Sequence, residues 1–217
     1  MQALGKVIDM KKLVLPGFTL CGLLLLTACA SAPKTAPSEE KAEADAKAAP
    51  VAPVAAKTAY WAMYTEARKW ATDLMPISVE AKDIPGFTNE DGKAAMWNAT
   101  FVSASQKEMR VFTYAIAAHP PDIYKGVTIG KPLPWNGARD VMPFSMGQVQ
   151  IDSDAAFKSA TIDAAAWLKQ HPEKNPTVTL KELTRYQVPT WIVFWGNDKL
   201  GYRAFVNGVD GKPMTGK

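Results

Sequence analysis

The sequence has few of the residues that build reactive sites. Its 217 residues include only two cysteines and two histidines. The nucleotide-binding patterns GxGxxG and GxxxxGK[ST] and the GxSxG pattern of serine hydrolases are absent. His119 and His171 each precede a proline at the expected end of a regular element, where solvation explains them more simply than a metal site or a catalytic dyad does. We therefore expect no enzyme, no cofactor and no metal centre.

The chain also lacks an apolar run long enough to span a bilayer. Residues 13–26 form an apolar stretch of roughly 14 residues, whereas a membrane-spanning helix needs about 20. Lys11 and Lys12 precede this stretch and small residues follow it, which is the order of a secretory signal peptide. Met10 is then a more natural start than Met1. The pattern predicts an exported protein.

The four residues Leu26-Thr27-Ala28-Cys29 follow the apolar stretch. They resemble the lipobox of bacterial lipoproteins. This resemblance implies a signal peptide over residues 1–28, cleavage between Ala28 and Cys29, and acylation of Cys29 with several palmitate-like chains, which together make a stable membrane anchor. Ala30 in place of aspartate implies the outer membrane, facing the periplasm, if the organism has two membranes. The alternatives are an ordinary signal peptide that ends near a cysteine, or a buried thiol.

Removal of residues 1–28 would leave a nearly neutral chain without a disulfide. Cleavage would remove three lysines, one aspartate and Cys21. The formal net charge would then fall from +4 to +2. A balanced charge gives no electrostatic footprint for nucleic acid. Residues 30–57 then contain no aromatic residue and are rich in alanine and proline. Such a segment cannot bury enough apolar surface to order itself, so we expect residues 29–57 to be the lipidated cysteine and a disordered linker.

The remaining residues, about 160, include all seven tryptophans and contain an internal sequence repeat. ARKWATDLMP at residues 67–76 resembles AAAWLKQHP at 164–172, and PISV at 76–79 resembles PTVT at 176–179. MWNATFVSASQKEMRVF at residues 96–112 resembles TWIVFWGNDKLGYRAF at 190–205. We therefore expect two related units, residues 58–149 with a connection and residues 150–217.

Periodicity predicts the same elements in each unit. Apolar residues recur at helical spacing from Tyr60 to Leu74 and from Phe157 to Leu168, and the helices are expected to stop near Pro76 and Pro172. Alternation then predicts strands over residues 97–102, 110–115, 191–195 and 202–207, and a short edge strand after GVDGKPM. The fold class is α+β, with two helix-plus-antiparallel-hairpin units that either extend one sheet or pack side by side.

The second unit carries a family resemblance. IDSDAAFKSA at residues 151–160, VPTWIVFW at 188–195 and YRAFVNGVDGKPM at 202–214 are similar to the helix start, the Pro-x-Trp strand and the final turn of PepSY domains of bacterial exported proteins. The resemblance covers residues 150–215, with a fainter echo in residues 58–116. It implies a periplasmic binding or inhibitory module without catalytic residues.

A few aromatic and cationic residues are candidates for binding. Trp70, Trp97, Trp167 and Trp191 lie on core-facing stripes, so packing is favoured over stacking on sugars. Trp135 lies in a Pro- and Gly-rich connection without a periodic partner, and together with Tyr124 it is a candidate binding surface. Arg110 and Arg203, at matching positions beside Phe112 and Phe205, could hold an anionic ligand between the units or pair with an acid across strands.

These observations predict a lipid-anchored periplasmic protein with a non-enzymatic domain for a protein, peptide or cell-wall partner. A structural subunit of an outer-membrane complex is one alternative. An envelope hydrolase with a site assembled from scattered acids is another. The sequence predicts a membrane as partner through the lipid on Cys29 and no nucleic acid.

Overall fold

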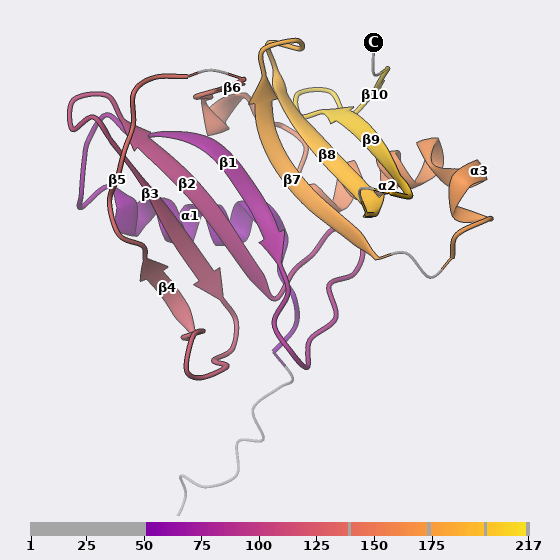
Figure 1. The fold of residues 1–217 in the computed structure, drawn as a ribbon, viewed down its shortest axis with the longest axis horizontal. Helices are drawn as coiled ribbons and strands as arrows, with labels where there is room; N and C mark the ends of the chain where they lie inside the picture. The colour runs from indigo at the N-terminus through magenta and orange to yellow at the C-terminus, as the bar shows by residue number, and fades with distance from the viewer. Residues whose placement is uncertain (1–50, 139, 173–174, 198, 216–217) are drawn as a thin grey trace, which may run out of the picture. The chain divides into compact units, whose positions relative to one another are not determined.

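Each half of the sequence folds into one helical segment followed by four antiparallel strands (Figure 1). The computed structural model describes residues 51–138, 140–172, 175–197 and 199–215. The predicted signal peptide, Ala28, Cys29 and most of the predicted linker lie outside the described residues. The first repeat consists of α1 (Ala56–Ala67), β1 (Met75–Lys82), β2 (Met96–Ser103), β3 (Glu108–Ala115) and β4 (Gly126–Ile129).

The second repeat has the same order of elements after a connecting segment. It consists of α2 (Ser153–Asp163), α3 (Ala165–Leu168), β7 (Pro176–Leu183), β8 (Pro189–Gly196), β9 (Gly201–Asn207) and β10 (Pro213–Met214). The connection contains β5 (Leu133–Pro134), β6 (Val141–Met142) and a 3-10 turn, η1 (Met146–Gln148). The α+β class and the β8–β9 hairpin were predicted correctly, and β10 is the expected edge strand.

The two repeats share one sheet, in the order β10-β9-β8-β7-β1-β2-β3-β4. The central neighbours β7 and β1 are the first strands of their repeats, and they pair antiparallel with Val79 opposite Leu180 and Glu80 opposite Thr179. The sequence had left open whether the units extend one sheet or pack side by side. They extend one sheet, and its middle is a seam between the repeats.

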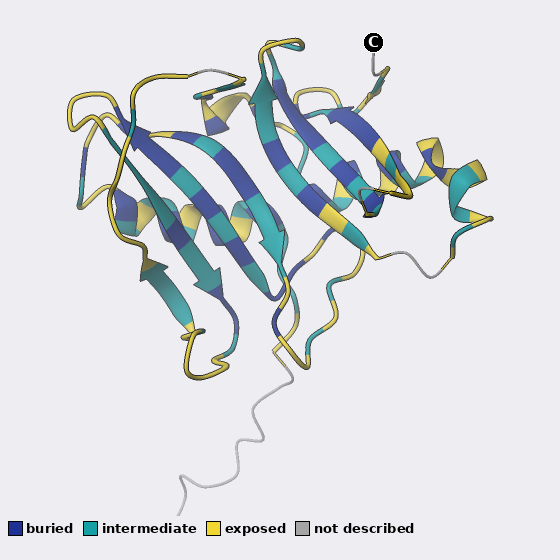
Figure 2. Cartoon of the chain, in the orientation of Figure 1, coloured by how far each residue is buried: buried dark blue, intermediate teal, exposed yellow. Residues whose placement is uncertain are grey.

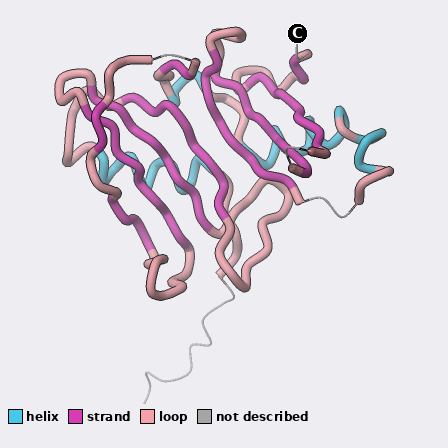
Figure 3. The backbone as a smooth tube through the Cα atoms, viewed as in Figure 1, coloured by secondary structure: helices cyan, strands magenta, loops and turns pink. Residues whose placement is uncertain are grey.

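In the described part of the chain, helices cover only one face of this sheet (Figure 3). In Figure 3 the helices lie behind the strands, and the face toward the viewer carries no helix. Alternate residues along the central strands are buried, as the banding in Figure 2 shows. The larger of two core clusters lies between helices and sheet, with members from both repeats, among them Met63, Trp97, Phe101, Ala160 and Trp191. The opposite face of the sheet is therefore available for contacts with other molecules.

Trp97 and Trp191 show that the repeats are equivalent in structure as well as in sequence. Both side chains are fully buried. The indole nitrogen of Trp97 donates to the carbonyl of Val54 at 2.9 Å, and that of Trp191 donates to the carbonyl of Ile151 at 3.0 Å. Each acceptor lies two residues before the first residue of its repeat's helix. Each tryptophan therefore fixes the entry of the chain into a helix, and the packing role predicted for it is confirmed.

Two boundaries of the first repeat were predicted wrongly. The folded chain starts before residue 58, because Ala56 is fully buried and Val54 pairs with Ala94, so the linker ends earlier than residue 57. Helix α1 ends at Ala67 and does not continue to Pro76, which lies in β1. Tight turns follow the helix, with the Trp70 amide bonded to the Ala67 carbonyl at 2.9 Å, and they still bring Trp70 onto the core.

The N-termini of α1 and α2 lie beside each other. The sequence favours Asp152 or Ser153 as the N-cap of α2, and in the structure it is Asp152, whose carboxylate accepts from the Ser153 amide at 2.7 Å. The same oxygen accepts from the Lys57 amide in α1 at 3.1 Å, and the buried Ser153 hydroxyl accepts from the Ala56 amide at 3.0 Å. A carboxylate is favourable beside the partial positive charge of helix N-termini. One pair of side chains thus caps helices from both repeats.

Candidate functional site

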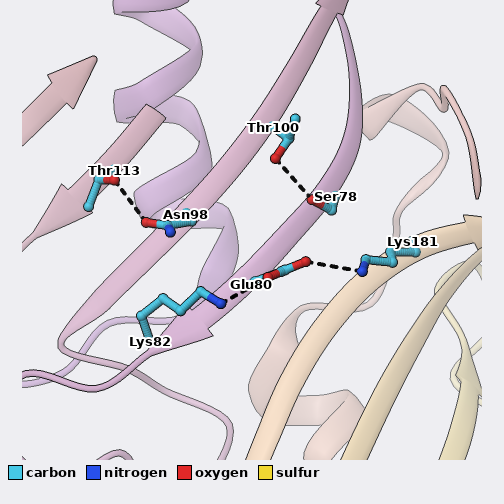
Figure 4. Close-up of polar contacts among 7 residues, drawn as sticks. All are labelled: Ser78, Glu80, Lys82, Asn98, Thr100, Thr113 and Lys181. Atoms are coloured by element: carbon cyan, nitrogen blue, oxygen red, sulfur yellow. Dashed lines mark hydrogen bonds and ion pairs between the residues drawn. The ribbon is translucent and has the colours of Figure 1, made fainter. Parts of the chain in front are cut away.

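The uncovered face of the first repeat is polar, and its side chains pair with one another. The hydroxyl of Ser78 donates to that of Thr100 at 3.2 Å, and the hydroxyl of Thr113 donates to the Asn98 side-chain oxygen at 2.8 Å (Figure 4). These residues come from β1, β2 and β3. Because their groups are already paired across strands, this half of the face has little unused hydrogen-bonding capacity.

Glu80 ties the two repeats together at the seam. Its carboxylate binds Lys82 of its own strand at 3.0 Å and Lys181 of β7 at 3.1 Å (Figure 4). Partial burial raises the pKa of Glu80, but the hydrogen bonds and positive charges of Lys82 and Lys181 outweigh it, so the pKa lies below its ordinary value of 4.5. The ionised carboxylate is therefore favoured in the folded protein.

We expect Glu80→Gln to lower the free energy of unfolding by about 1 kcal/mol at pH 7, near the upper end for partly exposed ion pairs. A depressed carboxyl pKa stabilises the fold above the unfolded-state pKa, and this contribution is lost as the pH falls through the folded-state value. The difference between variant and wild type should thus shrink below pH 4.5. Urea denaturation at several pH values checks this, and a difference that stays constant down to pH 2 would rule out the ion pairs as its cause.

The uncovered face of the second repeat is hollowed and mixes cations with apolar side chains. Phe194 of β8 lies opposite Arg203 of β9, and Ile192 lies opposite Phe205. These side chains line a groove of about 380 Å³, within the size range of ligand pockets. We call it the β7–β9 groove. Its lining residues are Val141, Thr177, Thr179, Lys181, Leu183, Arg185, Ile192, Phe194, Arg203 and Phe205.

Both arginines of the β7–β9 groove rest on aromatic rings. The Arg203 guanidinium lies 4.9 Å from the ring centre of Phe194. That of Arg185, in the turn after β7, lies 4.5 Å from Phe205 and 4.6 Å from Tyr186. A guanidinium group that lies over an aromatic ring can still donate hydrogen bonds from its N–H edges. Among the residues that the structure describes, neither arginine has an ion-pair partner, whereas Lys181 binds Glu80.

Arg110 and Arg203 do not share a cleft, and their apparent match is wrong. Arg110 pairs with Phe101, which is fully buried on the helix-covered face, and its guanidinium lies 4.6 Å from Trp70 and 3.1 Å from Glu108. Arg203 lies on the uncovered face. The pairs Trp97–Tyr114 and Trp191–Val206 align Arg110 with Tyr202 instead. A register slip of one residue moves a side chain to the other face of a sheet.

Trp135 and Tyr124 are not brought together either. Trp135 follows β5, which pairs with the Glu108 end of β3, and its amide donates to the Lys107 carbonyl at 3.0 Å. Tyr124 precedes β4, which pairs with the Ala115 end of the same strand. The two ends of β3 are roughly 20 Å apart. Tyr124 is 61% exposed and Trp135 is half-buried, so they are separate surface residues and not one binding surface.

The histidines take part in local structure. His119 exchanges two backbone hydrogen bonds with Ile123. The ring of His171 stacks on Trp167, with ring centres 4.3 Å apart, and its Nδ1 lies 3.0 Å from the Trp167 carbonyl. In the described part of the chain no three histidine, cysteine, aspartate or glutamate residues come close enough to hold a metal ion.

A second hollow lies beside α1 but is smaller. Tyr60, Trp61 and Tyr64 line it with Phe144 and Met146, and its volume is about 170 Å³, below the usual range for ligand pockets. Burial, with a smaller contribution from Tyr64, raises the pKa of Tyr60 well above its ordinary value, so this hydroxyl stays neutral. Of these two hollows, the β7–β9 groove is therefore the better candidate site.

Sequence reasoning missed most of the groove, including Arg185, Ile192 and Phe194. One signal was present, because residues 191–195 are all apolar. Trp191, Val193 and Trp195 are buried in the core, so Ile192 and Phe194 must occupy the other face. Apolar residues on an uncovered sheet face are a common sign of a contact surface.

Comparison with known proteins does not assign the chain to a family. No protein-family model matches it, and neither does any curated protein. A solved structure of a "putative lipoprotein" from Clostridium difficile 630 is similar at 11% sequence identity and a TM-score of 0.46, over 72% of this chain and 90% of that one. Among the described residues, no helix has the length and apolar character needed to cross a bilayer.

Proposed function

We propose that this protein is a lipid-anchored binding protein of the cell envelope, in which Cys29 holds the chain to a membrane and the β7–β9 groove binds a partner. The lipobox-like residues Leu26 to Cys29 support the anchor. Ala30 supports the outer membrane, facing the periplasm, as its location in a double-membraned bacterium. The similarity of residues 150–215 to PepSY domains remains a prediction from their sequence.

The groove is the observation that carries the binding role. It combines an apolar floor with two stacked guanidinium groups that have no acidic partner among the described residues. Arginine and aromatic residues are enriched at the centres of binding interfaces. Glu80, the acid next to this groove, is engaged by two lysines, which favours binding over acid–base hydrolysis.

The test places a photo-crosslinking residue at Thr177, which is exposed at the rim of the groove, in the full chain expressed in cells. The matched control carries the same residue at Lys158 on the exposed side of α2. We expect a covalent adduct from Thr177 and not from Lys158. Adducts from Lys158 alone would place the partner elsewhere and contradict the proposed site.

The same cells test the anchor. We expect the membrane-extracted wild-type protein to begin at Cys29 and to carry acyl mass, and Cys29→Ala to lose both the acyl mass and most of its membrane retention. The Thr177 adduct should weaken in Cys29→Ala if the anchor concentrates the domain near its partner. A wild-type chain that retains residues 10–28 without added mass would exclude the anchor.

A further inference from the structure

We propose that the β7–β9 groove binds an acidic peptide segment of a protein partner, in which two carboxylates are spaced in the order acid-x-acid. This inference rests on the proposed function, because it names the partner chemistry of the same site. It follows from the charges of the groove, from their spacing and from its depth.

The charges of the groove favour a carboxylate. Lys181, Arg185 and Arg203 contribute three cations, and Glu80 is the acid paired with one of them. The remaining two are guanidinium groups, whose planar edges match a carboxylate with two parallel hydrogen bonds. Because Phe194 and Phe205 already hold these planes, little side-chain freedom is lost when a carboxylate binds.

The spacing of the groove favours an extended peptide. Arg203 and Phe205 lie two residues apart on β9 and face the same side, so they are separated by roughly 7 Å. Arg185 covers the ring of Phe205, which is only 9% exposed. The two guanidinium groups therefore occupy neighbouring positions along the same face of β9. A peptide in extended conformation presents every second side chain to the same side at the same spacing, so two carboxylates in the order acid-x-acid can meet both arginines.

The depth of the groove favours a peptide over a lipid. Thr177, Thr179, Lys181 and Leu183 alternate along β7 and share a face with the β8 and β9 residues of the groove. The groove is thus one layer of side chains on an open sheet face. An acyl chain laid there would keep much of its surface in water, whereas a peptide can contact the floor with one side chain and keep its backbone solvated.

The experiment measures fluorescence anisotropy of the labelled peptide Gly-Ser-Glu-Ser-Glu-Ser-Gly with blocked ends, added to the full chain purified from membranes in mild detergent. We expect saturable binding that weakens with salt. Arg203→Gln and Arg185→Gln should each weaken it roughly tenfold or more, as expected for a lost hydrogen bond to a charged group. Lys158→Gln should leave it unchanged.

Changes in the probe test the idea without altering the protein. The peptide with both glutamates replaced by glutamine should bind at least roughly tenfold more weakly. Equal binding of the glutamine peptide would overturn the inference. Displacement of the probe by monomeric dihexanoyl phosphatidylglycerol at lower concentrations than by unlabelled peptide would also overturn it, because a lipid would then be the preferred ligand.

The outcome separates this inference from the proposed function. If no peptide binds but Thr177 forms an adduct in cells, the groove binds a partner of other chemistry and only this inference fails. If Thr177 forms no adduct while Lys158 does, both fail. Peptide binding that Arg203→Gln and Arg185→Gln leave intact would mean that the peptide contacts another surface, and the inference would again be wrong.

Discussion

Replacement of Trp191 with alanine is expected to lower the free energy of unfolding by about 3–5 kcal/mol, the usual range for truncating a buried tryptophan. The side chain is fully buried in the core that both repeats share. Its removal leaves a cavity and also deprives the Ile151 carbonyl of its indole donor. Since a domain of this size is stable by only about 5–15 kcal/mol, this one change removes a large share.

A more conservative variant separates the loss of the hydrogen bond from the loss of packing, and two variants at other tryptophans serve as comparisons. Trp191→Phe keeps most of the ring but loses the N–H group, and we expect the hydrogen bond to account for about 1 kcal/mol of the loss. Trp97→Ala should cost about as much as Trp191→Ala, because Trp97 holds the equivalent position and bonds the Val54 carbonyl. Trp61→Ala is the control, since Trp61 is 50% exposed. Urea denaturation gives these values, and a loss below about 1 kcal/mol for Trp191→Ala would contradict this account.

Replacement of Gly92 with alanine should also be strongly destabilising, by about 2–4 kcal/mol. Gly92 has a φ of 75°, a conformation that side chains disfavour. An added Cβ would clash with the Ser153 carbonyl oxygen and would lie 2.7 Å from the Cβ of Phe157. The turn before β2 would therefore be pushed away from the start of α2, which belongs to the other repeat.

Gly86 offers a matched control for this effect. Its φ is 85°, but an added Cβ would meet nothing within 4 Å. Gly86→Ala should then show only the backbone strain, about 1–2 kcal/mol. The difference between the two variants in thermal or urea denaturation measures the close approach of the turn to α2. Equal losses would show that this approach contributes nothing.

The sequence predicted the elements well where local pattern determines them. Alternation predicted the strands around Trp97 and Trp191. The Gly-flanked segment between Trp195 and Tyr202 predicted the β8–β9 hairpin. The Asp152 cap was equally visible, because a cap needs only its own sequence neighbours. In contrast, the end of α1 was predicted wrongly. Either a longer helix or the tight turns that follow Ala67 can place Trp70 against the core, and the apolar periodicity does not distinguish between them.

The groove could not be predicted because it depends on contacts between distant residues. Arg185 reaches Phe205 only through the pairing of β7, β8 and β9. The error in matching Arg110 with Arg203 was a shift of one position between similar hairpins, too small to see in the sequence and large enough to exchange the faces. The seam between β1 and β7 has no local signature at all, because its partners are about a hundred residues apart.

That seam makes the chain equivalent to a homodimer joined into one polypeptide. A single repeat alone would expose its first strand as an unpaired edge, and two copies meeting there antiparallel would be related by a two-fold axis. In a true homodimer both copies must carry the same residues. Here each half has been free to diverge, so one half of the uncovered face pairs its own polar groups while the other half carries stacked arginines. Covalent linkage thus allows a symmetric scaffold to present a single, asymmetric binding site.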